Sequence, residues 1–341
     1  MNLDQENGQI TNDFRLKQII PTLRYLLDKN LKLVLTSHWG RPDGKIVASL
    51  KLDKIAKLLE SELGQPVLKL DNCIDQEQVI ELAKEKLILL ENLRFYKEEE
   101  NNDIAFARKL AGRCDFYVND AFSASHRAHA SIAAITDFLP AAAGFLFQKE
   151  LTSLGLALEP ERPAVLILGG SKLETKLPTI NNLLAKYDYI LIGGAIANTL
   201  LKEKGIDVKK SLVDKCPKEV KSIITETKII LPIDFIWQAD KILDIGSKTI
   251  IKFTDILSNS RTVVWNGPLG LYETKPFDQG TVEIGKYLLD LKVFKVIGGG
   301  DTIDSLKNLP IFGKIDHVST AGGAMLEFLA GNKMPGIEAL S

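Results

Sequence analysis

Short runs of apolar residues alternate along the chain with segments in which apolar residues recur every three or four positions. The runs have the length and β-branched composition of buried strands, whereas the spaced segments are typical of amphipathic helices. This alternation predicts an α/β protein with parallel sheets and crossover helices. The expected strands are residues 32–36, 67–70, 87–90 and 115–118 in the first half, and 164–168, 189–192, 228–231, 262–265, 294–297 and 317–319 in the second.

Two helices of the first half can be placed from the signals at their ends. Apolar residues from Leu52 to Leu63 recur at helical spacing, and Gly64 follows them as a helix-ending residue. An earlier helix is expected to open at Asn12–Asp13, because either side chain can accept a capping hydrogen bond. Pro21 predicts an irregular first turn in that helix.

Length and linker composition predict two domains. At about 150 residues per domain, 341 residues correspond to roughly two. A helical pattern that ends in a run rich in proline and charge, at residues 159–163, separates the halves. The expected fold class is α/β, with two doubly wound parallel-sheet domains joined by a hinge helix. The expected domains are residues 1–158 and 159–325, and about residues 326–341 are expected to return to the first domain.

The charge balance argues against several classes of function. Lys and Arg total 43 and Asp and Glu total 44, so the formal net charge is -1. Proteins that bind nucleic acid or anionic membranes through bulk charge are usually basic, so any anion site here must be built locally. The longest uncharged stretch, Tyr189 to Leu201, is far shorter than the roughly 20 apolar residues of a membrane helix.

Cysteine usage and the polar start of the chain predict a cytoplasmic protein. The three cysteines are widely spaced and form no Cys-x-x-Cys pair, which favours reduced thiols over a disulfide framework or a zinc site. Residues 1–14 lack the basic start and apolar run of a signal peptide.

Basic side chains follow the strands of the first half. Because ligands of open α/β sheets bind at the carboxyl ends of the strands, these residues would meet at one edge. Alone, each arginine would be an ordinary surface residue, but together they predict a site for a small polyanion, whose oxygens a guanidinium can bind in pairs. The metal pair that His126-x-x-His129 suggests lacks a completing cysteine or acidic cluster. The basic residues are Arg15, His38, Arg41, Arg94, His126, Arg127 and His129.

Glycine-rich turns follow the strands of the second half. Glycine lets backbone N–H groups and helix N-termini approach an anion, and Lys172, Lys176 and Asp301 could complete a nucleotide site with magnesium. One such turn alone is more often a tight connection, and neither a P-loop nor a dinucleotide fingerprint is present. The turns are Gly169-Gly170-Ser171-Lys172, Gly193-Gly194-Ala195, Asn266-Gly267-Pro268-Leu269-Gly270, Gly298-Gly299-Gly300-Asp301-Thr302 and Thr320-Ala321-Gly322-Gly323.

A polyanion-binding half and a nucleotide-binding half together predict phosphoryl transfer between their ligands. Domain closure would expel water and align the donor with the acceptor. The rival enzyme class, a nicotinamide-dependent dehydrogenase, would need the dinucleotide fingerprint that this sequence lacks.

The motifs around these residues resemble those of the phosphoglycerate kinase family. The resemblance extends from about Gly8 to Leu340, and so many ordered motifs make it specific. The motifs are Ser37-His38-Trp39-Gly40-Arg41-Pro42, Leu90-Glu91-Asn92-Leu93-Arg94-Phe95, Asn119-Asp120-Ala121-Phe122, His126-Arg127-Ala128-His129-Ala130-Ser131, Trp265-Asn266-Gly267-Pro268 and Gly298-Gly299-Gly300-Asp301-Thr302.

The resemblance implies a glycolytic kinase that moves a phosphoryl group reversibly between 1,3-bisphosphoglycerate and ADP, giving 3-phosphoglycerate and ATP. It implies direct in-line transfer on domain closure, with Mg²⁺ bound to the nucleotide. It also implies a cytoplasmic monomer whose partners are these small molecules, with neither nucleic acid nor membrane among them.

The resemblance also assigns roles to single residues. Arg15, Lys172, Gly299 and Gly322 would be catalytic, and Lys172 would stabilise charge on the transferring group. Asp301 would bind the metal, and Glu273 would bind the ribose. The residues expected to bind phosphoglycerate are Asn2, Arg15, His38, Arg41, Arg94 and Arg127. The residues expected to bind nucleotide are Lys172, Lys176, Gly193, Gly194, Asn266, Pro268, Glu273, Gly298, Gly299, Gly300, Asp301, Thr302 and Gly323.

The start of the sequence departs from the family pattern. Family members open with a strand that ends in Asp-x-Asn-x-Pro, whereas spacing from Gly8 places only Asn2 on that motif and puts Asp4 at its proline. The sequence thus predicts a missing first strand, lowered stability and weakened substrate binding. Ala195 and Ala321 also replace usual glycines. The alternative to the kinase is therefore a truncated homologue that binds nucleotide but is catalytically impaired.

Overall fold

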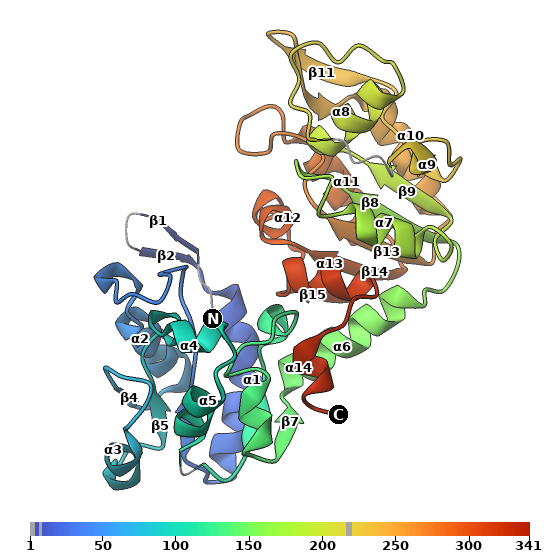
Figure 1. Cartoon of the computed structure of the whole chain (residues 1–341). Helices are drawn as coiled ribbons and strands as arrows, with labels where there is room; N and C mark the ends of the chain where they lie inside the picture. The colour runs from blue at the N-terminus through green and yellow to red at the C-terminus, as the bar shows by residue number, and fades with distance from the viewer. Residues whose placement is uncertain (1–3, 7–8, 113, 216–219) are drawn as a thin grey trace. The chain divides into compact units, whose positions relative to one another are not determined.

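A computed structural model describes residues 4–6, 9–112, 114–215 and 220–341 (Figure 1). The chain divides into two compact units. Unit 1 comprises Met1–Lys149 and Met334–Ser341, and unit 2 comprises Glu150–Lys333. The division falls inside helix α6 (Phe145–Leu158), whereas the sequence analysis placed it after residue 158. The C-terminal segment that belongs to unit 1 begins at Met334, eight positions later than the expected 326.

Unit 2 is built on one parallel sheet of six strands in the order β10-β9-β8-β13-β14-β15. The chain runs outward from β8 to β10 and then returns to place β13 on the other side of β8. Ligands of open α/β sheets bind at such a reversal, which here lies at the carboxyl ends of β8 and β13. The strands are β8 (Ala164–Leu168), β9 (Tyr189–Ile192), β10 (Ile229–Ile230), β13 (Thr262–Asn266), β14 (Phe294–Gly298) and β15 (His317–Ser319).

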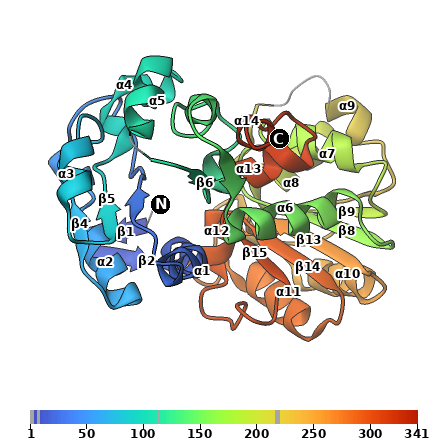
Figure 2. The ribbon, with the colours of Figure 1, turned by 90° about the horizontal axis from the view of Figure 1, so that it is seen from below.

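Helices cover both faces of this sheet, and an antiparallel hairpin adds to unit 2. Figure 2 shows α7 and α13 on one face, and α10 and α11 on the other. The hairpin pairs β11 (Phe235–Gln238) with β12 (Lys241–Ile245). The helices are α7 (Leu177–Leu183), α8 (Gly194–Glu203), α9 (Val220–Ile223), α10 (Ser247–Ser258), α11 (Gln279–Asp290), α12 (Gly300–Ser305) and α13 (Gly323–Leu329).

The strands of unit 1 form smaller sheets. A parallel sheet has the order β3-β5-β4, and β6 pairs in parallel with β7, a strand that the sequence analysis did not predict. β1 (Asp4–Glu6) and β2 (Gln9–Asn12) form an antiparallel hairpin apart from both. The lowered stability expected from a missing first strand stays a prediction. The parallel strands are β3 (Leu33–Leu35), β4 (Val67–Lys69), β5 (Leu87–Leu89), β6 (Tyr117–Asn119) and β7 (Ala141–Ala143).

Two hydrophobic cores lie on opposite faces of strand β5, because successive side chains of a strand point to opposite sides. Leu87 and Leu89 pack with α1 and α2, whereas Ile88 and Leu90 pack with α5 and the turn η4. The helical elements of unit 1 are α1 (Phe14–Asp28), α2 (Asp53–Leu63), α3 (Glu77–Leu82), α4 (Lys97–Glu100), α5 (Ile104–Ala111), α14 (Pro335–Glu338) and the short turns η1 (Ala48–Leu50), η2 (Leu93–Phe95), η3 (Phe122–Ala124) and η4 (Ala134–Asp137).

The start of α1 differs from the expectation. Asp13 occupies the N-cap position, but its side chain makes no capping hydrogen bond and instead forms an ion pair with Lys17 at 2.9 Å. Pro21 lies inside the helix rather than in an irregular first turn. Ile20 and Leu23 on either side of it are buried, so packing of the apolar face offsets the hydrogen bond that proline cannot make. In contrast, α2 ends as expected at Gly64, whose φ is 70°.

Candidate functional site

The basic residues of unit 1 lie in three segments that follow parallel strands. Residues 37–42 follow β3, residues 90–95 follow β5, and residues 120–129 follow β6. The segments are short and partly buried, so hydrogen bonds rather than regular secondary structure must fix them. Each segment thus follows the carboxyl end of a parallel strand, as the sequence predicts.

Arg94 is the most buried arginine of this group, with 6% of its surface exposed. Its Nη1 donates a hydrogen bond to the carbonyl of Gly40 at 2.9 Å, and its Nε lies 3.4 Å from a carboxylate oxygen of Glu100. Burial lowers the pKa of Arg94, and the charges of Arg127 and Arg41 lower it further, while Glu100 opposes them. The structure thus brings Arg41 and Arg127 within electrostatic range of Arg94.

Two histidines belong to the same cluster. Burial holds the pKa of His38 well below its usual value, and the charges of Arg94 and Arg127 add to this effect. The same causes lower the pKa of His129 to about 4. Both rings are therefore neutral near pH 7, and the arginines supply the positive charge that an anion would meet.

A buried carboxylate fixes the third segment. Glu99 is 3% exposed and accepts hydrogen bonds from Ser131 Oγ at 2.6 Å and from Ser131 N at 3.0 Å. Its Oε1 also lies 3.7 Å from His129 Nδ1. Burial raises the pKa of Glu99, although the hydrogen bonds oppose that shift. No local sequence pattern marks Glu99, because its partner Ser131 lies 32 positions away.

Two other residues that the resemblance assigns to the phosphoglycerate site do not lie in these three segments. Arg15 lies in the first turn of α1 and is half-buried. Asn2 lies outside the described residues. The cluster that the structure brings together includes His38, Arg41, Arg94, His126, Arg127 and His129.

In unit 2 the turns after β8, β13 and β14 converge on Asn266. Lys176 Nζ donates to Asn266 Oδ1 at 2.8 Å, and Asn266 Nδ2 donates to the Gly298 carbonyl at 3.1 Å. Thr302 Oγ1 donates to that carbonyl at 2.9 Å and accepts from the N–H of Gly267 at 2.6 Å. Four of the predicted nucleotide residues thus form one connected network at the expected edge of the sheet.

The ammonium group of Lys176 is buried in this network. Burial lowers the pKa of Lys176 to about 8, and the nearby carboxylate of Asp301 opposes the shift. Hydrogen bonding to a neutral amide compensates burial of a charge only in part. An anion placed beside Lys176 would therefore be bound strongly.

Several glycines are required where the turns touch one another. A Cβ atom on Gly169 would lie 2.0 Å from the Pro268 carbonyl oxygen, and one on Gly194 would lie 2.7 Å from Gly170 N. Hydrogen bonds from Gly170 N to Pro268 O and from Gly194 N to Leu269 O, both 2.8 Å, join the same backbones. The glycines after β8 and β9 therefore serve the packing of the turns.

Other glycines leave open space. A Cβ atom on Gly300, Gly322 or Gly323 would meet nothing within 4 Å. Gly300 and Gly323 are the first residues of α12 and α13, where backbone N–H groups lack partners within the helix. These positions leave room for a ligand beside the chain.

The remaining predicted nucleotide residues lie on the exposed rim. Lys172, Glu273 and Asp301 are exposed. Asp214, which the sequence analysis missed, accepts a hydrogen bond from Leu173 N at 2.8 Å and so holds the turn that carries Lys172. Burial raises the pKa of Tyr272, with Asp301 as the next cause, which places the Glu273 loop near α12.

A magnesium site in unit 2 would depend on the nucleotide. Among residues 4–6, 9–112, 114–215 and 220–341, no group of three or more His, Cys, Asp or Glu side chains is arranged to hold a metal ion. Asp301 is a single exposed carboxylate beside Lys176. It fits Mg²⁺ that keeps waters and binds chiefly to phosphate oxygens.

Comparison with known proteins relates the chain to an enzyme family. The family model described as phosphoglycerate kinase matches residues 1–332. A phosphoglycerate kinase of Pelotomaculum thermopropionicum is 43% identical over 99% of this chain and 94% of its own length, and one of Moorella thermoacetica is 43% identical over 100% and 94%.

Solved structures agree with this relation. The structure of phosphoglycerate kinase from Coxiella burnetii has a TM-score of 0.84 and 34% identity. That from Pyrococcus horikoshii has a TM-score of 0.89 and 32% identity. Each match covers 99% of this chain and 93% of the solved chain. The α/β fold with parallel sheets, expected from the sequence, is therefore confirmed.

Proposed function

The chain belongs to the phosphoglycerate kinase family, and on this premise we propose that it transfers a phosphoryl group reversibly between 1,3-bisphosphoglycerate and ADP, giving 3-phosphoglycerate and ATP. The observation that carries this proposal is the cluster around Arg94, in which Arg41 and Arg127 lie within electrostatic range and Gly40 accepts a hydrogen bond. Like charges gathered at a buried position favour occupation by a small polyanion.

Phosphoglycerate is proposed to bind in unit 1. Arg41, Arg94 and Arg127 would bind its phosphate oxygens, because a planar guanidinium can donate two parallel hydrogen bonds. His38, whose lowered pKa keeps it neutral, would donate a hydrogen bond without adding charge. From the sequence motif alone, we propose that Asn2 also binds phosphoglycerate.

The nucleotide is proposed to bind in unit 2, at the carboxyl ends of β8, β13 and β14. Lys176, Asn266 and Thr302 already form one hydrogen-bonded network there. The N–H groups around Gly299 and Gly323 would bind phosphate oxygens, and Asp301 would hold Mg²⁺, which shields the negative charge of the phosphates when bound. Gly193, Gly194 and Pro268 would enclose the adenosine, and Glu273 would bind the ribose.

The chemical step needs positioning and charge stabilisation rather than a covalent enzyme intermediate. Lys172 is exposed on its turn and would stabilise the charge of the transferring group. Arg15 would act on the acceptor carboxylate, and backbone N–H groups near Gly299 and Gly322 would assist. We also propose that the two units close during transfer and thereby exclude water.

The remaining expectations follow from the same activity. Because its substrates are dissolved metabolites, we propose a cytoplasmic monomer with small-molecule partners and neither nucleic acid nor membrane among them. Among the described residues, the helices are too short or too polar to cross a membrane.

Trapping of the acyl phosphate with hydroxylamine tests the proposed reaction. Purified protein, MgATP and 3-phosphoglycerate should give hydroxamate and ADP in equal amounts, and the signal should require phosphoglycerate. ADP release without hydroxamate would contradict the proposed acceptor. Binding of ADP without either product would instead favour the catalytically impaired homologue.

A further inference from the structure

One side chain of unit 1 joins two of the loops that carry the basic cluster. Asn92 lies in the loop after β5 and is fully buried. Its Nδ2 donates hydrogen bonds to the carbonyls of Trp39 at 2.8 Å and Leu50 at 3.0 Å. Its Oδ1 accepts from the N–H groups of Trp39 at 3.3 Å and Arg94 at 3.1 Å. Asn92 thus contacts both polar groups of the residue after His38 and the backbone of Arg94.

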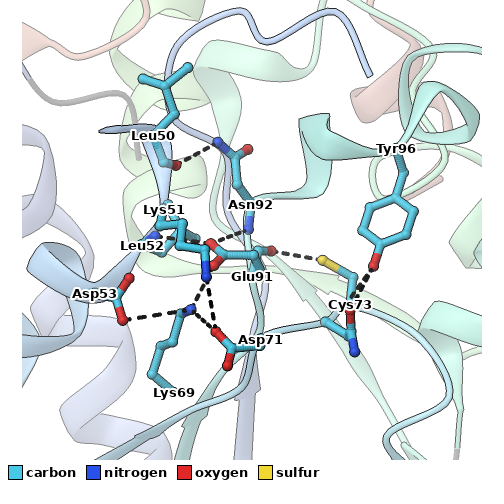
Figure 3. A network of polar contacts seen from close by, with 11 residues as sticks. Leu50, Lys51, Leu52, Asp53, Lys69, Asp71, Cys73, Glu91, Asn92 and Tyr96 are labelled. Carbon is cyan, nitrogen blue, oxygen red and sulfur yellow. Dashed lines mark hydrogen bonds and ion pairs between the residues drawn. The ribbon is translucent and has the colours of Figure 1, made fainter. Parts of the chain in front are cut away.

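A buried carboxylate holds Asn92 itself (Figure 3). Glu91 is 2% exposed, and its Oε1 accepts from the N–H groups of Asn92 at 2.8 Å and Leu52 at 2.9 Å. Lys69 donates to the other carboxylate oxygen at 2.6 Å. The thiol of Cys73 donates to the Glu91 carbonyl at 2.8 Å. The backbone that carries Asn92 is therefore fixed from both sides.

The position of Asn92 matters because the loops it joins carry like charges. The charges of Arg41 and Arg127 already disfavour the charged form of Arg94. Two other hydrogen bonds, Arg94 Nη1 to Gly40 O at 2.9 Å and Leu93 N to Ser37 O at 3.0 Å, also join the loops. They lie on either side of Trp39, whose backbone Asn92 holds. A neutral amide suits this position, because it both donates and accepts without adding to the charge.

We propose that Asn92 is a positioning residue, which holds residues 37–42 against residues 90–95 and so sets His38 and Arg41 at the spacing from Arg94 that a bound phosphate group requires. This inference rests on the proposed function and names a residue that would not itself touch the substrate. Pre-organised donors bind an anion more tightly because less ordering is needed on binding. Loss of Asn92 should therefore weaken phosphoglycerate binding more than nucleotide binding.

The test compares Asn92→Leu, which keeps the approximate shape and removes the amide, with Asp103→Ala. Asp103 caps α5 in the same unit by accepting a hydrogen bond from Phe106 N at 2.7 Å, and within the described part of the chain none of its hydrogen bonds reaches residues 37–42 or 90–95. Binding of 3-phosphoglycerate, of inorganic phosphate and of MgADP is measured separately by calorimetry, well below the melting temperature of every variant. Steady-state KM and kcat are measured in parallel.

We expect Asn92→Leu to raise the Kd and KM for phosphoglycerate about tenfold or more and to leave MgADP binding within twofold of the unaltered protein. Asp103→Ala should lower the melting temperature and leave both affinities unchanged. Equal phosphoglycerate affinity in Asn92→Leu and the unaltered protein would overturn the proposal. An equal loss of affinity for phosphoglycerate and for MgADP would also overturn it, because a general loss of structure would then explain the effect.

A second variant keeps the proposal testable if Asn92→Leu does not fold. Glu91→Gln retains an acceptor for Asn92 N and removes the charge that pairs with Lys69. It should therefore weaken phosphoglycerate binding, but by less than Asn92→Leu does. If Asn92→Leu is unfolded and Glu91→Gln binds phosphoglycerate as tightly as the unaltered protein, the positioning role is overturned.

Inorganic phosphate separates this proposal from the proposed function. If the unaltered protein binds phosphate but not phosphoglycerate, and Asn92→Leu weakens phosphate binding, the substrate assignment fails and the positioning role stands. If the unaltered protein binds neither, both proposals fail.

Discussion

The candidate anion sites of the two units are built by opposite means. In unit 1 the charged groups are arginine side chains, and a buried network of other side chains, including Asn92, Glu91 and Glu99, holds their loops. In unit 2 the turns are glycine-rich and pack directly on one another, so that the backbone itself forms the surface.

This difference determines how each site should respond to change. In unit 1, loss of one arginine removes a charge while the buried network still holds the loops. In unit 2, where backbone packs on backbone as at Gly169, there is no space for an added methyl group, so a small substitution there disturbs neighbouring turns. The predictions below test this contrast, starting with the largest expected effect.

The first prediction concerns added methyl groups in unit 2. Gly169→Ala should destabilise the protein by about 3 kcal/mol or more, because its Cβ would lie 2.0 Å from a carbonyl oxygen. Gly323→Ala should change the melting temperature little, since nothing lies within 4 Å. Thermal melts of both variants decide the matter. Similar melting temperatures would refute the tight packing of backbone turns.

The second prediction separates binding from chemistry in unit 2. Lys172→Ala should lower kcat by about a hundredfold to a thousandfold, the usual effect of losing one group that stabilises transition-state charge. The Kd for MgADP should rise far less than kcat falls, because Lys172 is exposed and outside the Asn266 network. An unchanged kcat would remove the proposed role.

The third prediction removes one charge from the unit 1 cluster. Arg94→Ala should raise the KM for phosphoglycerate about tenfold to a hundredfold, the effect of losing a charged hydrogen bond of roughly 1.5–3 kcal/mol. Arg108→Ala is the control, because Arg108 is an exposed arginine of the same unit that lies 5.2 Å from the Phe138 ring. A change confined to the KM for ATP would reverse the assignment of ligands to units.

The fourth prediction is a pH dependence confined to unit 2. The pKa of Lys176 is lowered to about 8, so this side chain loses its proton as the pH rises from 7 to 9. Nucleotide affinity should fall over that range by at most tenfold per pH unit, and Lys176→Met should abolish the dependence. Calorimetry at a series of pH values measures both proteins.

Protein stability should move in the opposite direction. The unfolded chain, with a lysine pKa near 10.5, binds more protons than the folded protein between about pH 8 and 10.5. The contribution of Lys176 to the free energy of unfolding therefore rises with pH in that window. Parallel decreases in binding and stability at high pH would indicate general unfolding rather than titration of Lys176.

Much of the framework could be predicted from the sequence. The strands of unit 2 predicted at 164–168 and 189–192 agree with β8 and β9, because buried parallel strands read as continuous apolar runs. The prediction at 317–319 also agrees with β15, although its sequence is His-Val-Ser. The basic and glycine-rich segments follow strands, so the carboxyl-end rule placed them without any tertiary information. Helix α2 could also be predicted from local signals, because Gly64 marks its end.

Other features depend on contacts between distant residues. Asn92 and Trp39 are 53 positions apart. No local pattern therefore indicates that the Asn92 side chain holds the loop that contains Trp39. The position of Pro21 inside α1 depends on the core beneath the helix, and the unit boundary within α6 depends on which neighbours each turn contacts. Propensity and composition contain none of this information.

The sequence by itself therefore determined the α/β class and the positions of many parallel strands along the chain, because these depend on periodicity and on local sequence. Only the tertiary structure decided which glycines pack against backbone, how far burial lowers the pKa of Lys176, and that Asn92 joins the loops of unit 1. These properties depend on desolvation and close approach, which arise only when distant segments are brought together.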